Sequence, residues 1–449
     1  MDKQTVEVVL GALLHSIGRV VCRARGCTGS FDEIGAEYLS SQLGQPALAE
    51  YIGHQRSSSL AALPDDHPAY IVHFASRLTG SDESLEDTLP MAAQRSLFNL
   101  LYDCEDTTFL FADILGDMPA VPAEKAVNTQ AAYGRLLERF EQDTRGADTA
   151  HLNLWLEAYE RCFSMVPAHA APDGDRDNSL YHSAKITAAF AAATHATLAA
   201  AAVRDYRGTL YTGAEAYAGA PHYLLVSMDI SGIQSFIYNI PSAGAMKNLR
   251  TRSFYLEMLL ENTADELLSL FGLSRANLLY TGGGHAYFLL PNLPDAETRI
   301  DQFMQHINQG LRSMFDDELF IGHGAVPCSG STLMGRAAPD AYASVFAGLS
   351  SQISRRKLQR YTPEQLIALN QAHPDTAERE CASCGRVRRN LRDGVCSVCT
   401  AFVAASNALI APDAVFTVSG QAGGLPLFSG QGQAQWFSAM PAEQAAALP

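Results

Sequence analysis

The stretch at residues 222–237, HYLLVSMDISGIQSFI, is where the hydrophobic pattern of the chain changes from helical to strand-like. Its first nine residues, His222–Ile230, form a short apolar run without helical spacing, which is typical of a buried strand. Two amphipathic helices and three further short strands are predicted downstream: a helix at Arg250–Phe271, strands at Leu278–Tyr280 and Ala286–Leu290, a helix at Ala296–Phe315 and a strand at Leu319–Val326. The order β-α-β-β-α-β predicts a ferredoxin-like domain, in which two helices cover one face of a four-stranded antiparallel sheet.

The remaining sequence divides into helical and irregular segments. Residues 1–200 are predicted to be almost entirely helical, with apolar residues at helical spacing in Val6–Val21, Tyr70–Leu78, Leu97–Tyr102, Tyr133–Phe140, His151–Phe163 and Ala184–Ala202. Helices at Ala341–Tyr361 and Thr400–Leu409 flank a cysteine-rich segment at 381–399. We therefore predict a multidomain α and α+β protein, divided into a helical domain (1–205), a linker (206–220), the ferredoxin-like domain (221–335), a small helical domain that contains the cysteines (336–411) and a weakly structured tail or start of a further domain (412–449).

The composition limits the classes of function. The 449 residues include 32 Lys and Arg against 48 Asp and Glu, and the resulting charge of −16 disfavours a simple non-specific nucleic-acid binder. Basic islands nevertheless occur at Lys247, Arg250 and Arg252, at Arg355, Arg356, Lys357 and Arg360, and at Arg386, Arg388, Arg389 and Arg392. They are compatible with phosphate contacts or, as charge runs usually are, with solvated faces. No window reaches about 18 uncharged apolar residues, so no membrane contact is expected. The odd cysteine count and the lack of a signal-peptide pattern favour the cytoplasm.

Four cysteines have the spacing of a metal site. Cys381 and Cys384 form one C-x-x-C pair, Cys396 and Cys399 form another, and eleven residues separate the pairs. Two such pairs can close a tetrahedral four-sulfur site, which suits zinc and leaves no open coordination position. The alternative, four free core cysteines, conflicts with the polar intervening sequence GRVRRNLRDG. The spacing therefore predicts a structural zinc.

Two further motifs suggest a nucleotide site. In the first, Asp229 ends the first predicted strand and is followed by Ser231 and Gly232, which can present a hydroxyl and backbone amides to a phosphate. In the second, the predicted hairpin carries Gly282, Gly283 and Gly284, which leave room for a ligand close to the backbone. A plain tight turn is the alternative interpretation of the glycines, but the predicted topology brings the two motifs together. We expect Asp229 to fix the turn by accepting backbone amide bonds.

At these residues the sequence resembles a known family. The stretches 229–238 (DISGIQSFIY), 247–257 (KNLRTRSFYLE) and 273–285 (LSRANLLYTGGGH) are similar to the first palm domain of the large, polymerase-like subunit of type III-A CRISPR effector complexes, the Csm type. The segment 357–361 (KLQRY) and the four cysteines resemble the segments on the C-terminal side of that palm in the family. The stretch 13–19 (LLHSIGR) is similar to a degraded copy of the family's HD motif.

The resemblance implies an N-terminal HD domain that cuts single-stranded DNA and two palm domains that convert ATP into cyclic oligoadenylate. It also implies a zinc element, and guide and target RNA held by neighbouring subunits. The chain departs from this pattern at Ser16, where the HD motif has Asp, at Ala75-Ser76, where the family has Ala-Asp, and at 180–183 (LYHS), where it has Leu-Tyr-Asp-His. His15, His54 and His73 are therefore expected to be isolated histidines, which hold hard divalent ions poorly. The Gly-Gly-Asp-Asp hairpin of the second palm does not occur in the sequence.

The resemblance thus implies a subunit of an RNA-guided antiviral complex that provides half of an ATP and cyclic oligoadenylate site and a scaffold for the guide-RNA-bound subunits. Ser231, Gly232, Gly282, Gly283 and Gly284 would form one wall of this site, and a palm on another polypeptide or on a missing part would hold the magnesium. No catalytic residue is assigned, and the HD nuclease is expected to be inactive. The alternatives are a free-standing nucleotide cyclase-like or HD phosphohydrolase enzyme, or a reduced, non-catalytic scaffold.

Overall fold

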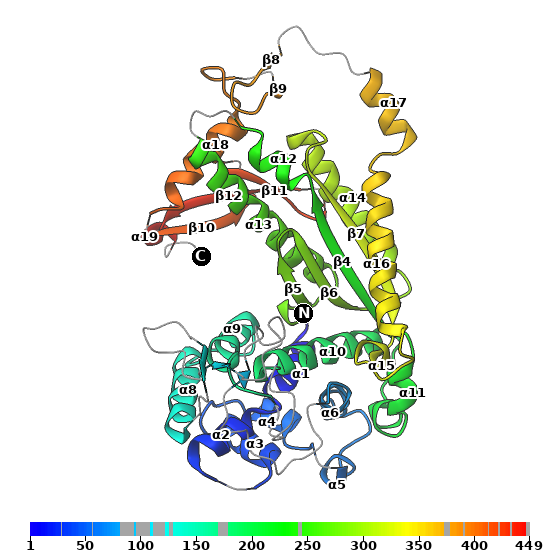
Figure 1. Cartoon of the computed structure of the whole chain (residues 1–449). Coiled ribbons are helices and arrows are strands. Elements are labelled where there is room, and N and C mark those ends of the chain that lie inside the picture. Colours follow the sequence, from blue (N-terminus) through cyan, green and yellow to red (C-terminus); the bar gives the residue numbers. More distant parts are fainter. Residues whose placement is uncertain are drawn as a thin grey trace.

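A computed structural model of the chain describes residues 1–80, 94–95, 108–110, 122–124, 129–168, 178–240, 245–371, 378–388 and 391–445, except Thr28, Arg56, Pro412, Gln421, Ala422 and Gly432. The helix predicted at Leu97–Tyr102 lies outside these residues. In Figure 1 a helical part formed by the first 200 residues lies below a mixed part that contains the larger sheet.

The N-terminal part is helical, as the periodicity predicts. Its helices are α1 (Lys3–Leu14), α2 (Ile17–Arg25), α3 (Phe31–Ser41), α4 (Pro46–Ile52), α5 (Ser57–Leu60), α6 (Ala69–Leu78), α8 (Gln130–Asp143), α9 (Leu152–Phe163) and α10 (Leu180–Ala200). The helix predicted over Val6–Val21 is instead two helices, because the chain bends by 42° at His15–Ser16. A small antiparallel sheet of β1 (Gln94–Arg95), β2 (Thr108–Leu110) and β3 (Pro122–Glu124) was not predicted.

Local sequence explains where these helices begin and how they pack. Asp2 caps α1 by accepting a hydrogen bond from the Thr5 amide at 2.7 Å, and Ser179 caps α10 through the His182 amide. The alanines of α10 allow close packing against α1, and both helices contribute to one continuous core. The segment predicted as a linker, 206–220, contains a π-helical turn at Arg207–Thr212 and helix α11 (Ala214–Gly219).

The ferredoxin-like domain contains the predicted elements in the predicted order. They are β4 (Tyr223–Ser231), α12 (Ile233–Tyr238), α13 (Ala245–Leu270), the 3₁₀ turn Arg275–Asn277, β5 (Leu278–Gly282), β6 (His285–Pro291), α14 (Ala296–Phe315) and β7 (Phe320–Cys328). The strands form an antiparallel sheet in the order β5-β6-β4-β7. This is the strand order that a β-α-β-β-α-β unit requires, and the short helix α12 is an addition to it.

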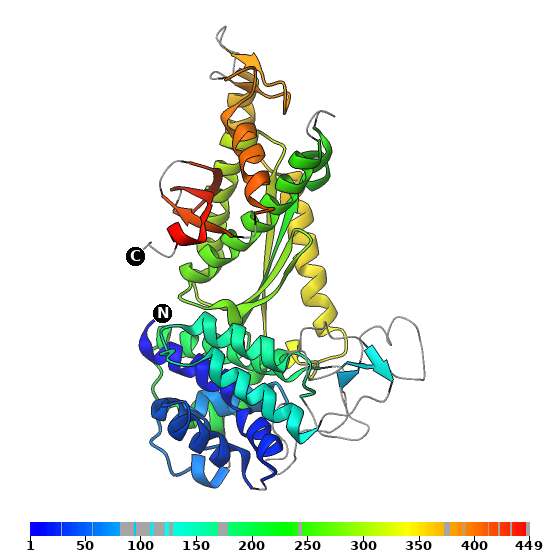
Figure 2. The same ribbon diagram turned by 90° about the vertical axis from the view of Figure 1, so that its left-hand side faces the viewer.

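Helices cover both faces of this sheet (Figure 2). Helices α13 and α14 pack on one face, whereas α16 (Ala341–Leu358) packs on the other, against β7 and β4. Gly322 and Gly324 of β7 make this close approach feasible, because a Cβ on Gly324 would lie 2.9 Å from the backbone oxygen of Leu349 in α16. The sheet is joined to the helical part by buried contacts, such as the hydrogen bond between the hydroxyls of Thr194 and Tyr223 at 2.8 Å.

The C-terminal region forms a further small layer. Its elements are α15 (Gly330–Leu333), α17 (Pro363–Gln371), β8 (Arg379–Glu380), β9 (Val387–Arg388), α18 (Ser397–Ala408), β10 (Ala414–Ser419), β11 (Leu425–Phe428), β12 (Ala434–Pro441) and α19 (Ala442–Ala445). Strands β10, β12 and β11 form an antiparallel sheet, which differs from the weakly structured tail predicted for 412–449; the other alternative, the start of a further domain, stays a prediction. The sheet contacts α13 and α14 through β11: Leu425, Leu427 and Phe437 are buried, and the Tyr255 hydroxyl donates to the Pro426 oxygen at 2.6 Å.

Among the described residues, no single helix is long and apolar enough to span a membrane. The bent pair α1 and α2 together reaches the length and hydropathy of a span, but these helices carry buried core residues such as Leu10 and Val20.

Candidate nucleotide site and candidate metal centre

The two glycine-containing motifs meet at one end of the larger sheet. The register of β4 and β6 places Asp229 opposite His285, and the Ile230 amide donates to the Gly284 oxygen at 2.9 Å. The end of the first strand therefore lies directly beside the Gly282–Gly284 hairpin, as the topology predicted. This proximity joins all five residues predicted to contact a nucleotide into one region.

The glycines of this region do not all face open space. Gly232, at φ +91°, lies so close to the Glu318 backbone oxygen that no side chain fits there, and Gly284, at φ +86°, packs against the end of Ile233. A Cβ on Gly282 would lie 2.9 Å from the Tyr280 hydroxyl. Only Gly283, at φ +61°, has no neighbour within 4 Å of where its Cβ would be. The positive φ favours glycine at all four positions, the Glu318 backbone also excludes a side chain at Gly232, and Gly283 is the one that leaves open space beside it.

The hydroxyl of Ser231 is buried and has no hydrogen-bond partner in the described part of the chain. A buried hydroxyl without a partner is costly, so Ser231 is a polar group with unused bonding capacity at the predicted position. The residue as a whole is half-buried and pairs with Phe320 of β7. Its hydroxyl can therefore meet a ligand by rotating about the side-chain bond.

Asp229 has different partners from those predicted. Its carboxylate accepts a bond from Lys357 Nζ at 2.5 Å and lies 3.1 Å from His285 Nε2, so the expectation that it accepts backbone amide bonds is wrong. Lys357 comes from the end of α16, and its Cγ lies 3.2 Å from where a Cβ on Gly322 would be. The sequence placed Lys357 in a basic island but did not assign it to this site. The ammonium group of Lys357 thus lies beside the Asp229 carboxylate, near the C-terminal end of β4.

A second ionic group lies on the other side of β7. Asp301 of α14 accepts from His323 Nε2 at 2.8 Å and from Arg356 at 2.7 Å. The hydrogen bond from His323, aided by the charge of Arg356, lowers the pKa of Asp301, whereas burial lowers the pKa of His323. Arg356 and Lys357 are therefore both engaged by carboxylates at the end of α16.

Several other basic residues also have partners within the protein. Arg252 is buried, donates to the Phe236 oxygen at 2.6 Å and lies over the rings of Phe236 and Phe402. Arg386 forms ion pairs with Glu318 and Asp316, and Arg388 lies 3.2 Å from Asp316. The guanidinium groups of these three arginines are thus already paired within the protein. Arg389 lies outside the described residues.

The four predicted metal ligands do come together. The sulfur atoms of Cys381, Cys384, Cys396 and Cys399 all lie within 4.8 Å of one another, and those of Cys384 and Cys396 are 4.0 Å apart. All but Cys384, which is half-buried, are buried. Among the described residues this is the only cluster of His, Cys, Asp and Glu close enough to hold a metal ion. Four sulfurs at this spacing fit a closed, tetrahedral site.

The surroundings of the cysteines also favour thiolates. The backbone amides of Ser383 and Cys396 point at the Cys381 sulfur, at 3.4 and 3.3 Å, and the Cys399 amide points at the Cys396 sulfur at 3.5 Å. Cys396 also caps the N-terminus of α18, where the helix dipole favours a negative charge. Since metal ligation requires thiolate, the donor set and its surroundings fit a bound metal.

Two of the histidines discussed for the N-terminal part, His15 and His73, are buried, whereas His54 is half-buried and His182 is exposed. His15 lies at the break between α1 and α2 and bonds the Ala12 oxygen through Nδ1 at 2.7 Å, while its Nε2 has no partner among the described residues. Burial lowers the pKa of His15 and of His73 to about 4, so both imidazoles are neutral at pH 7. Ser76 bonds the His73 oxygen, and His182 bonds the capping Ser179. The residues at 16, 76 and 182–183 thus supply no carboxylate.

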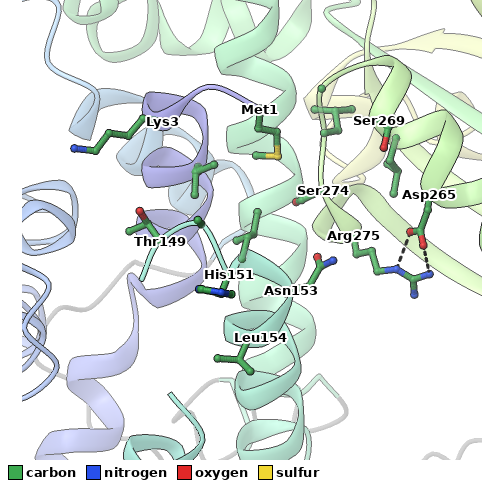
Figure 3. A pocket seen from close by; sticks show the side chains of 16 residues that line it. Met1, Lys3, Thr149, His151, Asn153, Leu154, Asp265, Ser269, Ser274 and Arg275 are labelled. Carbon is green, nitrogen blue, oxygen red and sulfur yellow. Dashed lines mark hydrogen bonds and ion pairs between the residues drawn. The ribbon is translucent and has the colours of Figure 1, made fainter. Parts of the chain in front are cut away.

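Figure 3 shows one cavity of the described part of the chain, with a volume of about 850 Å³. It is bordered by the start of α1, residues 149–154 and the C-terminal end of α13. Charged side chains in its wall have partners: Arg275 bonds Asp265 at 2.8 Å and Glu261 at 2.6 Å, and Lys3 lies 3.6 Å from Glu7. None of the residues predicted to bind a nucleotide or a metal lines this cavity.

The chain has relatives of known class. Residues 222–372 match the family model of the Csm1 subunit domain B. Two curated relatives are each described as a CRISPR system single-strand-specific deoxyribonuclease Cas10/Csm1 (subtype III-A). The relative from Mycobacterium tuberculosis is 32% identical, and the match covers 95% of this chain and 60% of the relative. The relative from Streptococcus thermophilus is 31% identical, and the match covers 89% of this chain and 55% of the relative. The chain therefore spans 60% or less of the length of these relatives.

Solved structures support the same relationship at the level of the fold. A crystal structure of the Csm1–Csm4 subcomplex in the type III-A CRISPR-Csm interference complex superposes with a TM-score of 0.71 at 20% identity, covering 97% of this chain and 56% of that one. A Csm1–Csm4 cassette in complex with pppApA gives a TM-score of 0.64 at 24% identity, covering 79% and 49%. By sequence over most of its length, and by fold, the chain is similar to the Cas10/Csm1 proteins of CRISPR subtype III-A.

Proposed function

We propose that this chain is part of the large subunit of an RNA-guided type III-A CRISPR effector complex, acting in the cytoplasm, in which it scaffolds the guide-RNA-bound subunits and provides half of a nucleotide site. The observation that carries the proposal is the match of residues 222–372 to Csm1 domain B, within which the Ser231–Gly232 turn and the Gly282–Gly284 hairpin lie side by side. Solved relatives have been crystallised as Csm1–Csm4 cassettes with ATP-derived ligands, which supports the choice of ligand class.

The proposed nucleotide site is incomplete by its own chemistry. Phosphoryl transfer from ATP requires divalent metal ions, which carboxylates hold. The carboxylate nearest to the hairpin, Asp229, is paired with Lys357 and His285, and residue 285 is a histidine where a metal-binding hairpin would carry an acid. We therefore place the magnesium on a second palm, located on another polypeptide or on a further part of the same protein. Ser231 and Gly283 then contribute the hydroxyl and the open backbone of this half-site.

The proposed metal of the four-cysteine element is zinc, in a structural role. Its support is the sulfur-only donor set with two C-x-x-C pairs, the mutual proximity of the four sulfurs and the amides directed at them. Zinc bound there would supply the folding energy that the polar loop between the pairs lacks, since only Leu391, Val395 and Val398 pack beside the cysteines.

The proposed HD-like region has no nuclease activity in this chain. Hard divalent ions need carboxylate ligands, and residues 16, 76 and 182–183 are Ser, Ser and His-Ser.

Native purification tests the proposal as a whole. A tagged chain expressed in its own host at natural level is purified and analysed by mass spectrometry for partner proteins and by sequencing for small RNA. We expect a complex that contains CRISPR subunits and a guide-length RNA. An RNA-free monomer that hydrolyses ATP with magnesium would instead support a free-standing enzyme, and an RNA-free dimer a reduced scaffold.

A further inference from the structure

The four-cysteine element is physically connected to the proposed nucleotide turn through one arginine. Arg386 comes two residues after Cys384, and its backbone oxygen accepts a bond from the Cys381 amide at 2.8 Å. Gly385, at φ +68°, makes this tight turn and donates to the Cys381 oxygen at 2.8 Å. The backbone of Arg386 is therefore part of the loop that presents the first pair of cysteines, and anything that holds the cysteines together also fixes Arg386.

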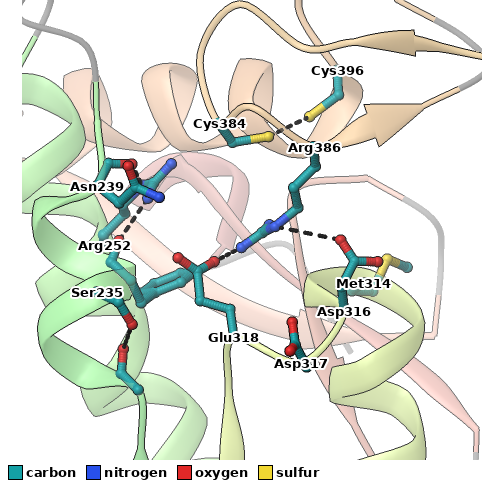
Figure 4. Close-up of polar contacts among 12 residues, drawn as sticks. Ser235, Asn239, Arg252, Met314, Asp316, Asp317, Glu318, Cys384, Arg386 and Cys396 are labelled. Carbon is teal, nitrogen blue, oxygen red and sulfur yellow. Dashed lines mark hydrogen bonds and ion pairs between the residues drawn. The ribbon is translucent and has the colours of Figure 1, made fainter. Parts of the chain in front are cut away.

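The side chain of Arg386 points away from the sulfurs and toward the loop between α14 and β7 (Figure 4). Its guanidinium forms an ion pair with the Glu318 carboxylate, its Nε lies 3.7 Å from Asp316, and it stacks 5.3 Å above the ring of Phe315. The Arg386 and Glu318 side chains are only 12% and 16% exposed, so water screens this pair weakly. Removing either partner would leave the other charge shielded and unpaired.

Glu318 in turn supports the proposed nucleotide turn from behind. Its backbone oxygen lies against Gly232, which comes directly after Ser231 and opens helix α12. The ring of Phe315, on which Arg386 stacks, also makes an edge contact with Phe236 of α12 at 5.4 Å. A displaced Glu318 loop would therefore displace the backbone of the Ser231–Gly232 turn, because there is no space between them to absorb the movement.

We propose that Arg386 is a positioning residue that couples metal binding at the four cysteines to nucleotide binding at the Ser231–Gly232 turn. The inference rests on the proposed function, since it assigns a nucleotide to that turn. Coupling between two sites is reciprocal, so nucleotide binding tightens metal binding by the same factor. If Arg386 only stabilised the fold, its replacement would lower the free energy of unfolding but would not change how metal binding affects nucleotide binding.

The first test measures the turn itself, without reference to nucleotide. Amide hydrogen exchange of residues 230–237 is compared in the full chain with zinc, after removal of zinc by a chelator, and in Arg386→Met with zinc. We expect faster exchange of this segment in both altered states. Arg388→Met is the matched control, because Arg388 bonds Asp316 and the Met314 oxygen but not Glu318. Unchanged exchange in folded, zinc-loaded Arg386→Met, or equal acceleration in Arg388→Met, would overturn the inference.

The second test measures the coupling between the two ligands. The dissociation constant for ATP is measured in the chain reconstituted with a polypeptide that carries the second palm, with and without zinc. We expect the removal of zinc to weaken ATP binding about tenfold in the natural sequence, within the range usual for coupled sites, and to have no effect in Arg386→Met or Glu318→Gln. Arg386→Lys keeps the charge but loses the planar guanidinium, so the effect of zinc removal on its ATP binding should lie between those of the natural sequence and Arg386→Met.

Failure of the inference differs from failure of the proposed function. If the reconstituted natural chain binds no ATP, the proposed function fails, while the exchange experiment still decides whether the arginine links the cysteines to the turn. If ATP binds equally well with and without zinc, the coupling is refuted and the nucleotide site stands.

Discussion

Lys357→Met tests the ion pair at the end of the first strand of the sheet. Methionine keeps most of the aliphatic stem that packs beside Gly322, but it removes the ammonium that bonds Asp229 at 2.5 Å. The Asp229 side chain is 15% exposed and that of Lys357 is 31% exposed, so the pair lies between a surface and a buried ion pair. A hydrogen bond between charged groups in such a position contributes about 1.5–3 kcal/mol, and we expect the free energy of unfolding to fall by about that amount.

Chemical denaturation and thermal unfolding measure this loss. For a unit of about 150–250 residues, each kcal/mol lowers Tm by about 2–4 °C. Arg355→Met is the control, since Arg355 is exposed on the same helix and its Nε bonds only Gln359 at 3.2 Å; it should change the unfolding free energy by about 0.5 kcal/mol or less. In a double-mutant cycle with Asp229→Asn, the two losses should not add. Additivity within about 0.5 kcal/mol would refute the view that Lys357 acts through Asp229.

The other predictions concern the cysteines, the helical part, Ser231 and His73. Cys384→Ser should release the zinc and make residues 378–402 sensitive to protease, as elemental analysis and limited proteolysis would reveal; a folded preparation without zinc would contradict the metal assignment. Residues 1–200 should support no manganese- or magnesium-dependent cleavage of single-stranded DNA, and robust cleavage lost in His15→Ala would contradict this. Ser231→Ala in a complex that contains the second palm should weaken ATP binding without lowering Tm. If the variant bound ATP as tightly as the natural sequence, Ser231 would not be part of the nucleotide site. Because burial lowers the pKa of His73 from 6.5 to about 4, its contribution to stability is fully present above pH 6.5 and is lost as the pH falls toward 4, by up to about 1.4 kcal/mol per pH unit. Replacement of His73 by Gln should make the free energy of unfolding depend less on pH in that interval. An unchanged slope would contradict the assignment to His73.

Much of the fold could be predicted from periodicity, because strongly patterned segments have few alternatives. The helix at Ala296–Phe315 has the predicted ends, and the four strands differ from prediction by a few residues at their ends. The C-terminal sheet was missed for a physical reason. Its strands are short, and glycine-rich segments connect them. They bury only a few side chains, such as Leu425 and Phe437, against helices that are distant in the sequence. The local composition of residues 412–449 does not indicate that such a packing partner exists.

The sites were predictable to different degrees. The four cysteines could be assigned from spacing alone, because ligand type and spacing encode the geometry directly. The meeting of Asp229 with the hairpin could be predicted from the strand order. Lys357 could not be assigned, since it lies 128 residues from Asp229 in the sequence and reaches it only because α16 packs over Gly322 and Gly324. The role of three of the four glycines was likewise hidden, because it depends on close contacts with Glu318, Ile233 and Tyr280.

Reconstitution of oligoadenylate synthesis asks whether this chain forms only half of the nucleotide site. The purified 449-residue chain is incubated with ATP and magnesium, alone and together with a polypeptide bearing a Gly-Gly-Asp-Asp palm, and the products are separated by chromatography and identified by mass. We expect no oligoadenylate and no tight ATP binding by the chain alone, and both activities once the second palm is added. Synthesis of oligoadenylate by the chain alone would contradict the claim that it forms only half of the nucleotide site.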